Sequence, residues 1–112
     1  MITVEVIRNI NQQIDSFTMS GHAESGPYGY DLVCAGASAV SLGAVNAIYS
    51  LLDVELNVEM KDDGGFLSCS IPSNLEEVTL EKVQLLLEGM IASLQSIADE
   101  YHEHITVIAR KK

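Results

Sequence analysis

A histidine and a cysteine stand twelve positions apart, at His22 and Cys34, on either side of a glycine-rich stretch. A cysteine acts as a nucleophile when its pKa is lowered and a base can take its proton. Asp31 is a good helix N-cap residue, and Cys34 lies three positions later, in the first turn of the expected helix. Free backbone N–H groups and the helix dipole favour a thiolate and an oxyanion there. With His22 as general base, the pair predicts thiol-dependent acyl transfer.

Less specific interpretations of the same residues stay open at this point. A cysteine near a helix start is often an inert, small hydrophobic side chain, and a loop histidine is often only solvated. Ser38 lies one turn after Cys34 on the same helix face, with Ser41 nearly so, and both are candidates to line a site. A bare Cys–His dyad and a triad with Asp31 as its third member are equally consistent with the sequence.

The other candidates for chemistry are weaker. Cys69 shares one face of an expected strand with Leu67 and Ile71, which predicts a core residue. His102 and His104 lie among acidic residues near the end of the chain, but a zinc site needs three or four converging ligands. The sequence has no phosphate-binding glycine motif. We therefore predict neither a metal nor a cofactor.

The pattern of apolar residues predicts the elements that must position this pair. Alternation of apolar and polar residues predicts strands at Ile2–Arg8 and Ile14–Ser20, which we expect to pair as a hairpin. Residues 21–30 contain three glycines and a proline and are typical of a loop. An apolar segment then runs from Asp31 to Leu52 without a further charge and predicts a long helix.

The second half of the sequence predicts a second hairpin, a second helix and a last strand. The expected elements are strands Val54–Lys61 and Phe66–Ile71 joined by a turn at 62–65, a helix that starts between Ser73 and Thr79, and a strand Ile105–Ala109 before the basic end Arg110–Lys112. The order ββαββαβ predicts an α+β two-layer sandwich, in which a mixed or antiparallel sheet packs on two helices.

Length and composition predict a single domain over residues 1–112, because 47% of the 112 residues are hydrophobic. Met1 leads directly into a strand pattern without a signal peptide, so we expect a cytoplasmic protein with two free thiols. The apolar segment is as long as a membrane span, but its serines and small residues favour a central helix packed against a sheet or a second copy, and no membrane partner. The net charge of −10 disfavours direct nucleic-acid binding and favours a basic partner.

The sequence resembles the ribosomal-processing cysteine protease family, Prp. The resemblance covers the full chain, including the strand order and the length, and it is specific because the histidine and the cysteine have fixed flanking residues. It rests on Gly21-His22-Ala23, Gly29, Asp31, Val33-Cys34-Ala35 and Ser38-Ala39.

The resemblance implies a cysteine endopeptidase that removes a short N-terminal extension from a protein of the large ribosomal subunit. It implies His22 as the base and Cys34 as the nucleophile, with Gly21, Asp31 and Ser38 supporting the site. It also implies a homodimer, and a glycine-rich loop that orders over the bound peptide. A dimeric module that binds the ribosomal protein or the assembling ribosome without cutting, and a redox or acyl-carrying thiol protein, are the alternatives.

Overall fold

Alternating apolar residues form the strands of one mixed five-stranded sheet, in the order β3-β4-β2-β1-β5. The computed structural model describes residues 1–22, 31–61 and 65–112. Its elements are β1 (Ile2–Arg8), β2 (Ile14–Ser20), α1 (Leu32–Leu52), β3 (Asn57–Met60), β4 (Phe66–Ser70), α2 (Glu77–Glu100) and β5 (Ile105–Lys111). The predicted order and the α+β class are confirmed. The predicted turn at 62–65 and the predicted loop at 21–30 lie mostly outside the described residues.

The sheet is antiparallel except at one edge, where β5 pairs parallel with β1. Ile2, Val4 and Val6 alternate along β1 and are buried on the face toward the helices. Phe17 of β2 lies opposite Cys69 of β4 on the same face, and both side chains are buried. The hydrophobic core therefore lies between one face of the sheet and the helices.

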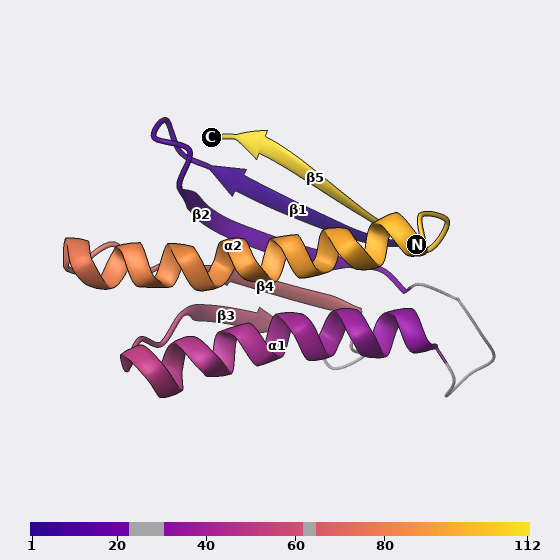
Figure 1. Ribbon diagram of the computed structural model, residues 1–112, viewed down its shortest axis with the longest axis horizontal. Helices are drawn as coiled ribbons and strands as arrows, with labels where there is room; N and C mark the ends of the chain where they lie inside the picture. The colour runs from indigo at the N-terminus through magenta and orange to yellow at the C-terminus, as the bar shows by residue number, and fades with distance from the viewer. Residues whose placement is uncertain (23–30, 62–64) are drawn as a thin grey trace.

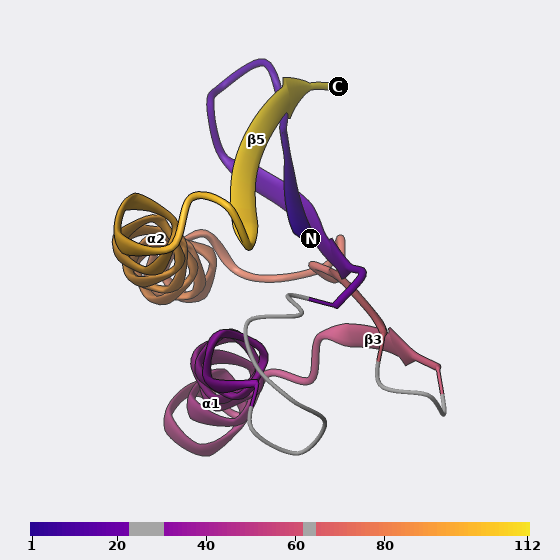
Figure 2. The same ribbon diagram turned by 90° about the vertical axis from the view of Figure 1, so that its right-hand side faces the viewer.

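Both helices lie on that one face, side by side and running in opposite directions (Figures 1 and 2). Helix α2 faces the core with an apolar stripe at helical spacing: Val83, Leu87, Met90, Leu94 and Ala98. Tyr101, which follows at the same spacing, is the C-terminal cap and is exposed. The stripe thus ends with the helix itself.

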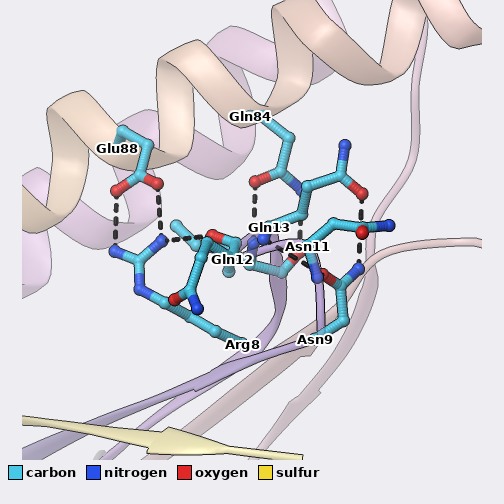
Figure 3. A network of polar contacts seen from close by, with 8 residues as sticks. Arg8, Asn9, Asn11, Gln12, Gln13, Gln84 and Glu88 are labelled. Atoms are coloured by element: carbon cyan, nitrogen blue, oxygen red, sulfur yellow. Dashed lines mark hydrogen bonds and ion pairs between the residues drawn. The ribbon is translucent and has the colours of Figure 1, made fainter.

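A set of polar contacts ties the turn between β1 and β2 to α2 (Figure 3). The amide of Gln84 bonds to the backbone of Ile14 twice: its Oε1 accepts from the N–H at 2.8 Å, and its Nε2 donates to the carbonyl at 2.7 Å. The guanidinium of Arg8 donates both to the carboxylate of Glu88, at 2.6 and 2.8 Å, and to the carbonyl of Gln12. These contacts fix the hairpin against the helix.

Three predicted strands have bounds that differ from the observed ones: β4 ends at Ser70 instead of Ile71, and β3 and β5 differ by more. β3 begins at Asn57 instead of Val54, because Asp53 caps the end of α1. Asp53 adopts a left-handed conformation, and its N–H donates to the carbonyl of Tyr49. The chain there turns inward and buries Val54 before it becomes a strand. β5 runs on through the basic end, to Lys111 instead of Ala109. It can do so because β1 offers a partner along its whole length, and ion pairs join Arg110 to Glu5 and Lys112 to Asp15.

Helix α1 is covered by the rest of the described chain on one side only. Its core-facing residues are Val33, Ala37, Ser41 and Ile48, whereas Leu32 and Leu51 are 76% and 70% exposed. By length and composition it is the one helix in the described part of the chain that could cross a membrane. In this fold it packs along α2 on the core face of the sheet, as expected for a helix packed against a sheet, and it leaves an uncharged face uncovered.

Candidate active site

Cys34 lies in the first turn of α1, as predicted, and its backbone is held by the cap. The carboxylate of Asp31 accepts a hydrogen bond from the N–H of Cys34 at 3.0 Å, and the Asp31 carbonyl accepts from Ala35 at 3.0 Å. The predicted cap is therefore confirmed. The sequence had suggested that free N–H groups here bind an oxyanion, but the N–H of Cys34 is already used by this carboxylate. The positive end of the helix dipole remains available to a negative charge.

The thiol of Cys34 is half-buried and borders a cavity of about 120 Å³. We call this the Cys34 cavity. Its wall comes from the end of β2, the first turns of α1 and the paired ends of β3 and β4, and it is largely apolar. The lining residues are Ile2, Met19, Gly21, Cys34, Ser38, Leu42, Met60, Gly65, Phe66 and Leu67. A reactive sulfur beside an apolar hollow can meet a bound side chain and its neighbouring carbonyl group together.

Gly21 forms the part of the wall that follows β2. Its N–H donates to the carbonyl of Gly65 at 2.9 Å, which continues the pairing of β2 with β4 by one more residue. Its φ of +89° is a conformation that residues with a side chain rarely adopt, and a Cβ here would collide with the carbonyl oxygen of Met1. Glycine is therefore required at the point where the chain leaves the sheet toward His22.

The structure brings several of the predicted residues together at this cavity. Gly21, Cys34 and Ser38 share the cavity wall, and Asp31 caps the helix beneath the thiol. His22 follows Gly21 directly and is exposed. Among the described residues it makes no hydrogen bond to Cys34, although catalytic hydrogen bonds are often long until substrate is bound. Gly29 of the predicted loop lies outside the described residues.

The prediction that Ser41 lines the site is wrong. Its side chain is fully buried behind the cavity, and its hydroxyl donates to the carbonyl of Ala37 and contacts the sulfur of Met19 at 3.7 Å. A serine in a helix commonly bonds back to the carbonyl one turn earlier. Ser41 thus supports Met19, which does line the cavity.

Sequence reasoning missed most of the apolar wall. Met19, Met60 and Phe66 come from three different strands, and no local pattern joins them. The one usable signal was the alternation along Val54–Lys61, which places Met60 on the apolar face. Lys61 lies over the ring of Phe66 at 4.9 Å from its centre and so covers one wall residue from outside.

The second thiol has the opposite surroundings. Cys69 is 1% exposed, and burial raises its pKa to about 11. A thiol that stays protonated at neutral pH is a poor nucleophile. The predicted core role of Cys69 is therefore confirmed.

These features define a class of protein. A small α+β domain that places a half-buried thiol on the first turn of a helix, beside an apolar cavity, has the construction of a cysteine peptidase. A family model described as cysteine protease Prp matches residues 1–106. The chain belongs to this family, and it is a cysteine protease.

Relatives with known names and structures agree with this assignment. The ribosomal processing cysteine protease Prp of Bacillus subtilis (strain 168) is 41% identical, with 96% of each chain covered, and that of Staphylococcus aureus (strain Mu50) is 43% identical over 94% of this chain and 95% of the relative. The crystal structure of the S. aureus protease with a covalently linked product peptide has a TM-score of 0.89 and 38% identity, over 98% of this chain and all of that one. Its complex with a substrate peptide has a TM-score of 0.83 and 37% identity over the same shares.

Proposed function

We propose that this chain removes an N-terminal extension from a protein of the large ribosomal subunit, with Cys34 as the nucleophile and His22 as the general base. One observation carries the assignment of roles: the half-buried Cys34 thiol stands at the positive end of α1, on the wall of an apolar cavity. The other thiol, Cys69, is buried and protonated, so Cys34 is the better nucleophile of the two.

The reaction begins with proton transfer from the Cys34 thiol to the imidazole of His22. The sulfur adds to the scissile carbonyl carbon, and the displaced electron pair becomes an oxyanion stabilised by the α1 dipole. The C–N bond then breaks, and the imidazolium proton passes to the departing amine, which leaves a thioester on Cys34. Water loses a proton to His22 and adds to the thioester, and the sulfur leaves and regains its proton. These steps require the His22 imidazole to lie within hydrogen-bonding distance of the thiol when the peptide is bound.

The supporting roles follow from the contacts of three residues. Asp31 fixes the first turn of α1 through the N–H of Cys34, so it holds the backbone that carries the thiol. Ser38 adds a hydroxyl to an otherwise apolar wall and can bond to the backbone of a bound peptide. Gly21 lets the chain pass close to Met1 and deliver His22 beside the cavity.

A ribosomal protein as substrate is supported by the names and complexes of the relatives and by charge. The matched relatives are named for ribosomal processing, and the S. aureus protease has been solved with substrate and covalently linked product peptides. A covalent link to peptide is what nucleophilic catalysis by a thiol produces. Ribosomal proteins carry many basic residues, which a chain of net charge −10 attracts.

The proposed assembly is a homodimer of single-domain chains in the cytoplasm. Residues 1–112 act as one domain, and both cysteines are free, as in a reducing compartment. The uncharged face of α1, with Leu32, Tyr49 and Leu51 exposed, is the surface on which a second copy would pack. Sedimentation should give twice the chain mass, and Leu51→Lys should lower it to that of one chain. An unchanged mass for this variant would exclude α1 as the interface.

Cleavage of the ribosomal protein by matched cysteine variants tests the catalytic proposal. We expect Cys34→Ala and His22→Ala each to lower kcat/KM by about 10³-fold or more, because they remove reacting groups. Cys69→Ala is the control and should retain kcat/KM within about threefold. Circular dichroism checks that all three variants fold, and mass spectrometry identifies the new N-terminus. Cleavage by Cys34→Ala at the rate of the unchanged protein would overturn the proposal.

A further inference from the structure

Strand β3 lies at one edge of the sheet, and some of its backbone N–H and C=O groups point outward from that edge. β3 pairs antiparallel with β4, and the N–H of Lys61 just after it donates to the carbonyl of Phe66 at 3.3 Å. Because hydrogen-bonded positions alternate along an antiparallel strand, Asn57 and Glu59 face β4 as Lys61 does. The N–H and C=O groups of Val58 and Met60 therefore point away from the sheet, along its outer edge.

The two faces of this edge differ in chemistry. Val58 and Met60 lie opposite Cys69 and Leu67, so their side chains are on the helix face, and they are 43% and 56% exposed. Glu59 is on the other, open face, opposite Ser68, and is exposed. A strand added here would place alternate side chains beside apolar Val58 and Met60 and beside the acidic Glu59.

The edge is continuous with the Cys34 cavity. Met60, the last residue of β3, lines that cavity together with Cys34 and Leu67. Figure 1 shows β3 running along α1 toward the end of the helix at which Cys34 lies. A chain that pairs with β3 would therefore lie beside Met60, at the border of the cavity.

We propose that the outer edge of β3 binds the peptide substrate as an added strand, and that it prefers a peptide in which apolar residues alternate with Lys or Arg. This inference rests on the proposed function, since it gives the same active site a second, extended subsite. Main-chain hydrogen bonds to Val58 and Met60 supply affinity, and the alternating side chains supply specificity.

Charge favours a basic peptide over a second copy of this chain as the occupant. Glu59 is exposed on β3, Glu55 is exposed just before β3, and Asp53 is exposed at the end of α1. Two β3 edges paired with each other would bring these carboxylates together, and like charges at close range destabilise a strand pair. A peptide with Lys or Arg at alternate positions would instead meet opposite charge.

Hydrogen exchange on the Cys34→Ala variant tests the added strand directly. The probe is a synthetic peptide that spans the N-terminal extension of the ribosomal protein and the first residues after it. We expect the peptide to slow exchange of the amides of Val58 and Met60 by at least about 10-fold, while Asn57 and Glu59, which already face β4, change little. Equal protection along β3, or none, would overturn the added strand.

This result separates the inference from the proposed function. If the unchanged protein cleaves the peptide and Cys34→Ala does not, yet Val58 and Met60 stay unprotected, the protease assignment stands and the β3 subsite is wrong. Protection of Val58 and Met60 that appears without peptide, and grows with protein concentration, would assign the edge to a second copy and also overturn the inference.

Charge reversal tests the preference for basic residues. We expect Glu59→Lys to raise KM for the same peptide by about 10-fold at low salt, and by less at 0.5 M salt, where charges are screened over about 4 Å. Glu81→Lys, an exposed position on α2, is the matched control and should change KM by less than about twofold. An equal effect of both variants would show that only the overall charge matters and would overturn the subsite.

Discussion

The two helices of this small fold differ in what they bury and in what they expose. On the α2 side, which comprises α2 with β1, β2 and β5, apolar residues are buried in a continuous stripe, and polar side chains bind the hairpin turn (Figure 3). On the α1 side, which comprises α1 with β3, a helix face without charged residues is exposed and a thiol borders a cavity. The α2 side is organised for stability and the α1 side for contact with other molecules.

This division suggests how a chain of 112 residues keeps a reactive site without losing its fold. Exposed apolar groups on α1 and β3 contribute little to folding, because they stay in water. The core between the sheet and the two helices supplies the stability, and the exposed face of α1 does not add to it. Substitutions on the exposed face of the α1 side should therefore change activity, and those among the buried contacts of the α2 side should change the free energy of unfolding.

The two thiols give the largest expected contrast, in their rates of alkylation. The pKa of Cys69 is raised to about 11, so at pH 8 only about one in 1,000 of these thiols is ionised. We expect iodoacetamide to modify Cys34 in the folded chain at least about 100-fold faster than Cys69, as measured by mass spectrometry of peptides. In denaturant both should react at similar rates. Equal rates in the folded chain would mean that Cys69 is not part of a closed core.

Gln84 on the α2 side should affect stability and leave catalysis alone. Gln84→Ala removes both hydrogen bonds to the backbone of Ile14 and leaves two main-chain groups without their partner. We expect the free energy of unfolding to fall by about 1–3 kcal/mol in urea titrations. The cleavage rate of the folded protein should not change.

A second glutamine on the same helix provides the control for this experiment. Gln95 is exposed, and within the described part of the chain its amide bonds only to Asp99, one turn away, at 2.8 Å. Gln95→Ala should therefore lower the unfolding free energy by less than about 0.5 kcal/mol. If the two variants are equally stable, the contact with Ile14 does not hold the hairpin to α2.

The sequence predicted those features that depend on local patterns. The order of elements follows from alternation and helical periodicity, and the cap at Asp31 places Cys34 in the first turn without reference to the rest of the fold. Cys69 was assigned to the core because its strand neighbours are apolar. In each case the residues that decide the feature are close together in the sequence.

The features that sequence reasoning missed depend on residues far apart in the chain. Met19, Met60 and Phe66 meet only after three strands and α1 have packed. The late start of β3 depends on the left-handed Asp53. The contact that holds the β1–β2 hairpin to α2 depends on Gln84, which is 70 positions from its partner Ile14. The family resemblance assigned the catalytic roles of base and nucleophile to His22 and Cys34, and these roles are predictions that the variants test.

The smallest expected effect concerns the ion pair between Arg8 and Glu88, also on the α2 side. A two-point hydrogen bond from Arg8 lowers the pKa of Glu88, and the same bond raises the pKa of Arg8. Since the Glu88 pKa is lower in the folded chain than in the unfolded chain, the pair stabilises the fold above the unfolded carboxyl pKa of about 4.3. That contribution is lost as the pH falls through the lower, folded value. Arg8 stays charged throughout this range.

Urea titrations of Glu88→Gln at two pH values measure this contribution. The Glu88 side chain is 44% exposed, so water screens the pair, and we expect a loss of less than about 1 kcal/mol at pH 7. The difference from the unchanged protein should shrink toward zero at pH 3, and 0.5 M salt should reduce it at pH 7. A difference that persisted at pH 3 would mean that Glu88 acts through packing instead of charge. Because this pair lies on the α2 side, peptide cleavage at pH 7 should stay the same, and a loss of cleavage would show that the two sides of the domain are coupled.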